Sequence, residues 1–138
     1  MTDTKMEIPI GARGEASWIV QGEDLASRLV EKEGDSFPAV FSTARMIALM
    51  ELAAARAIAP YLTPGQESVG VLVDITHVAA TPPGARVTAR ATYVGPEGKV
   101  HGFEIAAEDE AGEIGRGRHQ RAIVDAERLV RGAARRRR

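Results

Sequence analysis

A single carboxylate stands in the middle of an otherwise apolar helical segment. Residues 41–62 read FSTARMIALMELAAARAIAPYL, and Glu51 is their only acid. Arg45 and Arg56 project about 120° and 140° away from Glu51, so neither can pair with it inside the helix. A partner must therefore come from elsewhere in the fold. At 100° per residue, the neighbours of Glu51 on the helix surface are small or apolar: Ala44, Ile47, Ala48, Ala54, Ala55 and Ile58.

The chemistry that such a carboxylate can perform is that of a general base or a nucleophile. Burying an unpaired carboxylate costs several kcal/mol, which proteins tolerate mostly at functional sites. Two structural alternatives stay open for Glu51: the helix face is more exposed than its sequence indicates, or an arginine from a strand neutralises the acid.

Two other residues could take part in acid–base chemistry. His77 lies in DITHVAATPPG, at the end of a strand-like run, where side chains are often displayed for function. A lone histidine beside apolar residues is more often structural, so the residues alone favour that interpretation. Thr43, like Ser42, is a candidate N-cap of the helix. It lies two helical turns before Glu51, about 12 Å away, too far for contact within one helix.

The sequence indicates neither a metal site nor a nucleotide site. His101 and His119 have no metal-ligand spacing with His77, and we interpret both as surface or structural groups. The glycines in GRG (115–117) do not link a strand to a helix, so they are not a nucleotide fingerprint.

The elements that must position these residues can be read from the sequence. Ser42 or Thr43 begins the long helix and Pro60 lies near its end, so we expect a helix over 41–62. One long helix with antiparallel strands predicts an α+β fold with the helix on one face of the sheet. Alternation and turn residues predict strands at 16–20, 68–79, 86–94, 99–109 and 113–129.

Composition limits the class of protein. The 138 residues are 44% hydrophobic, which favours one domain over residues 1–130, followed by a basic tail (131–138, RGAARRRR) that we expect to be disordered. A formal charge of −1 gives no argument for nucleic acid, and the tail alone would bind it weakly. The sequence lacks cysteine, an apolar run of about 20 residues and a signal-like start, so we expect a cytoplasmic protein that does not bind membranes.

Three blocks of sequence resemble one known family. FPAVFSTARMIALMELAAARAIAPYL, VGVLVDITHVAATPPGARVT and GRGRHQRAIV are similar to the hot-dog-fold acyl-CoA thioesterases, above all to the fluoroacetyl-CoA thioesterase family. The resemblance runs from about Phe37 to Val124. It implies a long central helix wrapped by a curved antiparallel sheet, and a homodimer with active sites at the subunit interface. It also implies hydrolysis of a small or short-chain acyl-CoA without a cofactor, coenzyme A being part of the substrate.

The resemblance also assigns roles to individual residues. Glu51 would be the nucleophile or the general base, assisted by His77 and Thr43. The positions matching the family's acyl pocket are Phe37, Gly70 and Arg121.

One position departs from the family pattern. The family places a second phenylalanine three residues before Phe37, where this chain has Gly34. The missing ring should open the entrance, so we do not expect selectivity for a fluorinated acyl group.

Two other functions remain as alternatives. A hot-dog enoyl-CoA hydratase-like enzyme usually carries an Asp-x-x-x-x-His pattern, which is missing before this helix. A non-catalytic acyl-CoA-binding protein would have no need to keep Glu51, Thr43 and His77 together.

Overall fold

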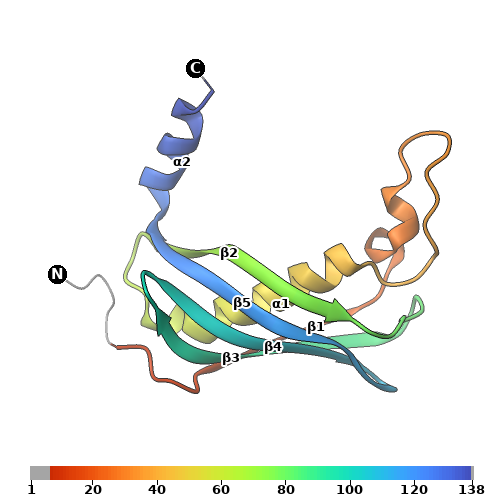
Figure 1. Ribbon diagram of the computed structural model, residues 1–138, viewed down its shortest axis with the longest axis horizontal. Coiled ribbons are helices and arrows are strands. Elements are labelled where there is room, and N and C mark those ends of the chain that lie inside the picture. Colours follow the sequence, from red (N-terminus) through yellow and green to blue (C-terminus); the bar gives the residue numbers. More distant parts are fainter. Residues whose placement is uncertain (1–6, 138) are drawn as a thin grey trace.

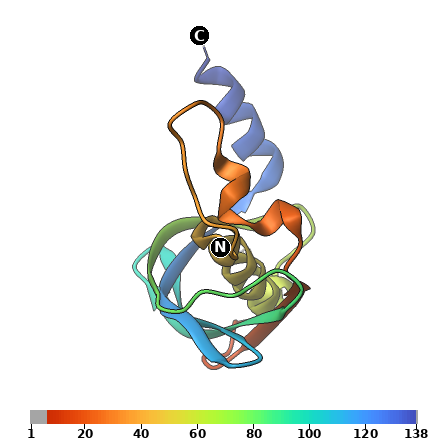
Figure 2. The same ribbon diagram turned by 90° about the vertical axis from the view of Figure 1, so that its right-hand side faces the viewer.

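A computed structural model describes residues 7–137 and shows one long helix held inside a curled antiparallel sheet (Figures 1 and 2). The sheet order is β1-β3-β4-β5-β2, and every neighbouring pair is antiparallel. The central helix is α1 (Thr43–Ile58), and a second helix, α2 (Ala126–Arg135), follows the last strand. The strands are β1 (Arg13–Ile19), β2 (Gln66–His77), β3 (Arg86–Glu97), β4 (Val100–Asp109) and β5 (Gly112–Asp125); short 3-10 helices are η1 (Gly22–Asp24), η2 (Ala26–Leu29) and η3 (Ala59–Tyr61).

The core lies between α1 and the concave face of the sheet. β3 alternates as its sequence predicts, with Val87, Ala89, Ala91 and Tyr93 all buried. Small residues let α1 approach β1 closely, since a Cβ at Gly14 would collide with the backbone of the helix. The buried face of α1 consists of Met46, Leu49, Met50, Ala53, Ala54, Ala57 and Ile58.

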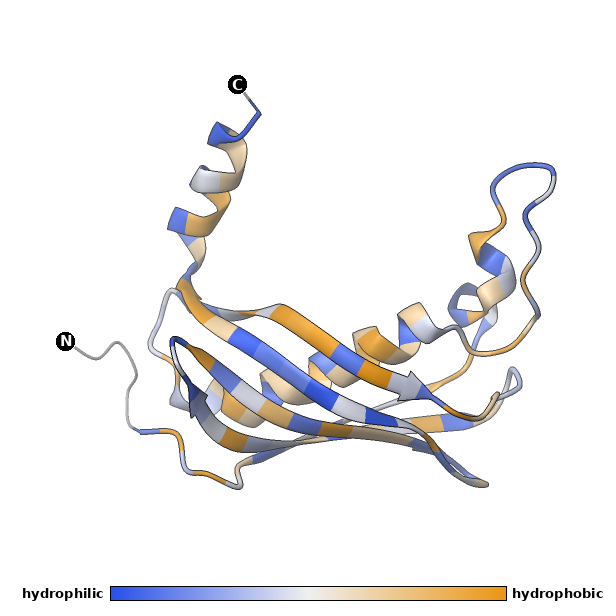
Figure 3. Ribbon diagram, in the orientation of Figure 1, coloured by the Kyte–Doolittle hydropathy of each residue, from blue (hydrophilic) through white to orange (hydrophobic). Residues whose placement is uncertain are grey.

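β2 is an edge strand that contains several hydrophobic residues (Figure 3). Val71, Leu72 and Val73 are 52%, 42% and 40% exposed. The pairing of β2 with β5 shifts register between Gly70 and Leu72, so a bulge interrupts the strand at this point. An unpaired apolar edge of this kind is a surface on which another strand can pair.

The C-terminal region differs from the sequence prediction. The expected strand to residue 129 ends at Asp125, whose side chain accepts a hydrogen bond from Arg128 N at 2.9 Å and so begins α2. The expected boundary between domain and tail at residue 130 falls inside α2, and residues 131–135 are helical rather than disordered; Arg138 lies outside the described residues. α2 leaves the sheet and projects away from it (Figure 1), with Leu129 and Val130 exposed.

The central helix is shorter than predicted. It ends at Ile58, and the last residues of the expected helix form η3 around Pro60, whose ring cannot continue an α-helical ladder. Over residues 7–137, no helix is both long enough and apolar enough to cross a membrane.

Candidate active site

Thr43 and His77 meet at the beginning of α1. Ser42 is the N-cap, because its hydroxyl accepts a hydrogen bond from Arg45 N at 3.0 Å. The hydroxyl of Thr43 is therefore available, and its Oγ1 lies 2.8 Å from His77 Nδ1 at the end of β2. The two side chains line a cavity of about 400 Å³ together with Ala26, Pro38, Val40, Phe41, Ser42, Val78, Ala79 and Ala80.

The other ring nitrogen of His77 has no partner. Its Nε2 is the one buried side-chain polar atom among residues 7–137 that makes no hydrogen bond. Burial lowers the pKa of His77 below 6.5, and the Ala79 backbone opposes that shift only in part. A neutral imidazole with a free nitrogen is suited to accept or donate a proton on a bound molecule.

Glu51 lies beside the buried face of α1 rather than at its centre. Of its neighbours on the helix, Ala54 and Ile58 are buried but Ala44 is exposed, and the Glu51 side chain itself is 42% exposed. The neighbours are small and apolar as predicted, but this helix face is more exposed than its sequence indicates, which was one of the two structural alternatives left open for Glu51. The prediction of a partner from another element is confirmed, since Arg121 Nη1 of β5 lies 3.8 Å from Glu51 Oε2.

Gly70 makes room for the carboxylate. A Cβ at this position of β2 would collide with Glu51 Oε2, so only a residue without a side chain lets the acid lie against the strand. The same Cβ would come 3.2 Å from His119 Cε1. Gly70 and Arg121 are also register partners in the β2–β5 pairing, which explains why both meet Glu51.

Arg121 is held by a buried network. Its Nε donates to Ser68 Oγ and its Nη2 to the Ser68 carbonyl, each at 2.8 Å. Its Nη1 lies 3.1 Å from His119 Nε2, and His119 Nδ1 lies 2.7 Å from the Leu72 carbonyl. The contact between His119 and Arg121 was not predicted from the sequence. It could have been expected from their spacing, because residues two positions apart on a strand lie on the same face.

The predicted residues form two groups and not one. Within the described residues, no hydrogen bond or ion pair joins Glu51 to Thr43 or His77. Phe37 lies in the loop between η2 and α1 and is 47% exposed, and Gly34 in the same loop has a φ of 101°.

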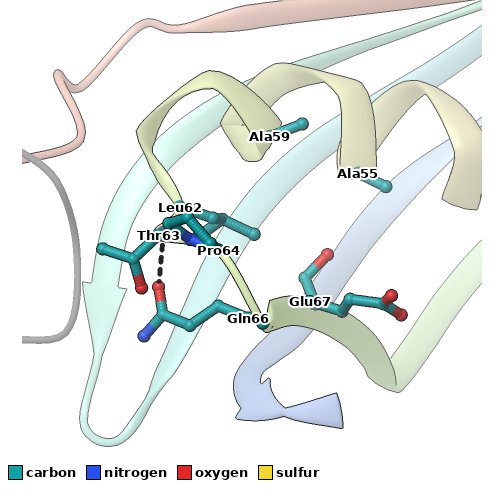
Figure 4. Close-up of a pocket in the computed structure, with 9 residues that line it drawn as sticks. Ala55, Ala59, Leu62, Thr63, Pro64, Gln66 and Glu67 are labelled. Atoms are coloured by element: carbon teal, nitrogen blue, oxygen red, sulfur yellow. Dashed lines mark hydrogen bonds between the residues drawn. The ribbon is translucent and has the colours of Figure 1, made fainter.

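A second cavity follows α1 beyond Glu51 (Figure 4). Its volume is about 510 Å³, and Ala55 and Ala59 give it a wall on the helix face that carries Glu51. Two of its lining residues are joined by a hydrogen bond, which Gln66 Oε1 accepts from Thr63 N at 2.9 Å (Figure 4). Ser68 links it to the Arg121 network. The full lining is Ala55, Ala59, Leu62, Thr63, Pro64, Gly65, Gln66, Glu67 and Ser68.

Comparison with known proteins identifies the family. The model of the fluoroacetyl-CoA-specific thioesterase family matches residues 20–127. The chain belongs to this family. A fluoroacetyl-CoA thioesterase from Streptantibioticus cattleyicolor is 47% identical over 93 residues, which are 67% of each chain. The family hydrolyses CoA thioesters, so the chain is an acyl-CoA thioesterase.

Solved structures confirm the hot-dog fold. The structure of the fluoroacetyl-CoA thioesterase FlK is 36% identical, with a TM-score of 0.87 over 94% of this chain and 98% of that one. A thioesterase superfamily member from Thermus thermophilus is 32% identical, with a TM-score of 0.82 over 94% and 96%. A hot-dog-like protein from Thermanaerovibrio acidaminovorans, 23% identical with a TM-score of 0.80 over 94% and 93%, shares the fold.

Proposed function

We propose that this thioesterase hydrolyses a small or short-chain acyl-CoA, with Glu51, His77 and Thr43 as its reacting groups. The observation that carries the proposal is the unpartnered Nε2 of His77, on a ring bound to Thr43 at a cavity. A buried nitrogen without a partner needs an explanation, and a reacting molecule supplies one.

Glu51 supplies the carboxylate for the first step. It attacks the acyl carbon to give a mixed anhydride and a thiolate, or it takes a proton from a water that attacks the same carbon. Arg121 Nη1 lies 3.8 Å from Glu51 Oε2 and orients the carboxylate without a close hydrogen bond. In the anhydride route, a water then attacks the anhydride while His77 takes one of its protons and passes it to the thiolate, which releases the free acid and restores Glu51. In the water route, the proton taken by Glu51 passes through His77 to the thiolate. Thr43 orients the imidazole. The first N–H groups of α1 have no partner inside the helix and can stabilise the oxyanion.

The complete site requires two chains in this proposal. Thr43 and Glu51 are two turns apart on α1, about 12 Å, and no described bond brings them together. The exposed apolar edge of β2 offers a surface for a second copy. A two-fold axis that sets the central helices antiparallel lets Glu51 of one chain face Thr43 and His77 of the other. The cytoplasmic location expected from the sequence stays a prediction.

Gly34 bears on the substrate. A glycine in place of a second phenylalanine leaves Phe37 as the one exposed aromatic ring of this loop, since Phe41 is buried. A Cβ at Gly34 would meet nothing within 4 Å, so the space beside it is open. We therefore propose that short acyl groups in general are accepted, without selectivity for the fluorinated one.

The first experiment follows thiol release from acetyl-, fluoroacetyl-, propionyl-, butyryl- and phenylacetyl-CoA. Wild type should cleave at least one of them, and Glu51→Gln and His77→Ala should each lower kcat by about 100-fold or more. If Glu51→Gln hydrolyses as fast as wild type, the assigned mechanism is wrong.

A mixing experiment tests the shared site. Glu51→Gln and His77→Ala chains are mixed, unfolded and refolded together. If each site takes Glu51 from one chain and His77 from the other, half of the dimers are mixed and carry one intact site. About a quarter of the wild-type activity should then return. No recovery would place all three groups in one chain.

A further inference from the structure

The Arg121 guanidinium donates hydrogen bonds to two residues, and His119 is the one bound by the nitrogen nearest Glu51. A guanidinium has five N–H donors and no acceptor. Nε and Nη2 are fixed by the hydroxyl and carbonyl oxygens of Ser68. Nη1 donates to His119 Nε2 at 3.1 Å, which leaves its second hydrogen to face Glu51 Oε2 at 3.8 Å. The direction of the hydrogen that faces Glu51 therefore depends on the acceptor at His119.

The contacts of His119 determine its protonation state. The Leu72 carbonyl can only accept, so Nδ1 carries the proton of the 2.7 Å bond. Arg121 can only donate, so Nε2 is a bare acceptor. His119 is thus neutral, with its proton on Nδ1. It is buried, with 1% of its surface exposed, so water cannot take over either contact.

Groups from four elements face the His119 ring. Arg121 lies beside it on β5, the Glu51 carboxylate approaches from α1, the Leu72 carbonyl belongs to β2, and the Phe103 ring of β4 lies 6.0 Å away between centroids. Burial and Arg121 lower the pKa of His119 below 6.5, while the Leu72 carbonyl and Glu51 act in the opposite direction. A protonated ring would turn an N–H toward an N–H of Arg121 and push the guanidinium away from Glu51.

We propose that His119 is a positioning residue, whose bare Nε2 holds the Arg121 guanidinium beside Glu51. This inference rests on the proposed role of Glu51. The distance of 3.8 Å suits that role, because Arg121 attracts and orients the carboxylate without occupying its lone pairs in a close hydrogen bond. Those lone pairs stay available for a water or an acyl carbon.

Two substitutions of His119 separate positioning from packing. His119→Gln keeps an acceptor where Nε2 stands and cannot titrate, whereas His119→Leu fills the space without an acceptor. We expect His119→Leu to lower kcat for the best acyl-CoA by about 10- to 100-fold and to change KM by less than about threefold. We expect His119→Gln to keep kcat within about threefold at pH 8 and to lose activity less steeply than wild type below pH 6.5.

The matched control is His101→Gln. His101 is a half-buried histidine on β4, and its Nδ1 lies 2.7 Å from the Tyr93 hydroxyl instead of Arg121. The His101→Gln substitution should leave kcat within about twofold of wild type. Equal losses in His119→Leu and His119→Gln, or no loss in either, would overturn the proposal.

A second measurement does not depend on turnover. ¹⁵N NMR of the histidine rings in the full chain, assigned by the signals missing in His119→Gln, reports the tautomer at pH 7.5. A proton on Nδ1 is expected, and a proton on Nε2 would overturn the proposal whatever the substrate is. If wild type cleaves no thioester while the tautomer is as expected, the function proposed for Glu51 has failed and the link from His119 to Arg121 stands.

Discussion

At the scale of single residues, Gly70 is where one methyl group would disturb Glu51 most. A Cβ there collides with the end of a flexible side chain and not with backbone, so the carboxylate can move aside. We expect Gly70→Ala to lower kcat about 10- to 100-fold, because a small misplacement of a reacting group is costly, while the free energy of unfolding changes by less than about 1 kcal/mol.

Gly22→Ala is the control for that substitution. Its Cβ would meet only the Arg28 guanidinium at 3.4 Å, an ordinary contact, so both kcat and stability should stay near wild type. Steady-state kinetics and urea unfolding measure the two effects. Wild-type kcat in Gly70→Ala would show that the position of Glu51 against β2 is unimportant.

Some residues of the candidate site could be recognised from the sequence, and others could not. Glu51 stood out because an acid interrupts an apolar helix, and the need for a partner from another element followed from the helical angles alone. The choice between Ser42 and Thr43 as the cap was open in the sequence, and the structure decides it because only Ser42 bonds to Arg45 N. His119 was not recognised, because its role depends on a carbonyl of β2 and a guanidinium of β5 that meet only in the folded sheet.

At the scale of elements, the beginning of α1 separates stability from chemistry at two adjacent residues. Ser42 is buried and caps the helix, whereas Thr43 is exposed and contacts His77. Ser42→Ala should lower the free energy of unfolding by about 1–2 kcal/mol. Thr43→Ala should change it by about 0.5 kcal/mol or less, yet lower kcat about tenfold because His77 loses its orienting bond.

Urea unfolding and kinetics on the two variants check this division. The slope of the unfolding free energy with urea should match wild type in both, since neither substitution changes the surface buried on folding. A stability loss in Thr43→Ala as large as that in Ser42→Ala would mean that the threonine shares the cap.

The elements themselves were predictable where periodicity is strong. Strands 86–94 and 99–109 correspond to β3 and β4, because alternation and flanking turns are local signals. The end of β5 was missed because VDAERLV mixes apolar and charged residues in an order that fits the alternation of a strand as well as a helix. In the structure the Asp125 side chain caps a helix by accepting a hydrogen bond from Arg128 N. Leu129 and Val130 therefore lie on α2 and are exposed, instead of continuing the strand.

At the scale of the whole molecule, the proposed dimer would make the exposed edge of β2 necessary for activity. Val71 is 52% exposed on this edge, at the bulge beside Gly70. A charge on an edge strand opposes pairing with a second strand and leaves the monomer fold intact. If the proposed dimer pairs through this edge, Val71→Lys should shift the mass in solution from dimer toward monomer, measured by light scattering. It should also lower kcat in parallel, because each site of the proposed dimer takes residues from two chains.

Ile10→Lys is the control for the assembly test. Ile10 is 74% exposed and lies before β1, so an added charge there should change neither mass nor activity. Full activity in a monomeric Val71→Lys protein would contradict a site built from two chains.

The stability of the whole molecule should also depend on its three histidines. Burial is the largest cause that lowers the pKa of His77, His101 and His119 below 6.5 in the folded protein. Below about pH 6.5 the unfolded chain therefore binds protons that the folded chain does not, and protonation favours unfolding. The stabilisation is complete above this pH and is lost as the pH falls toward the lowered values.

Urea unfolding between pH 8 and 5, at one protein concentration because assembly also contributes, measures this dependence. The free energy of unfolding should decline once the pH passes below about 6.5, and His101→Gln should make the decline shallower, since one titrating group is gone. A free energy that rises toward pH 5 would mean that the folded protein takes up protons more readily than the unfolded chain. The burial of these imidazoles against Thr43, Tyr93 and Arg121 would then not govern the acid response.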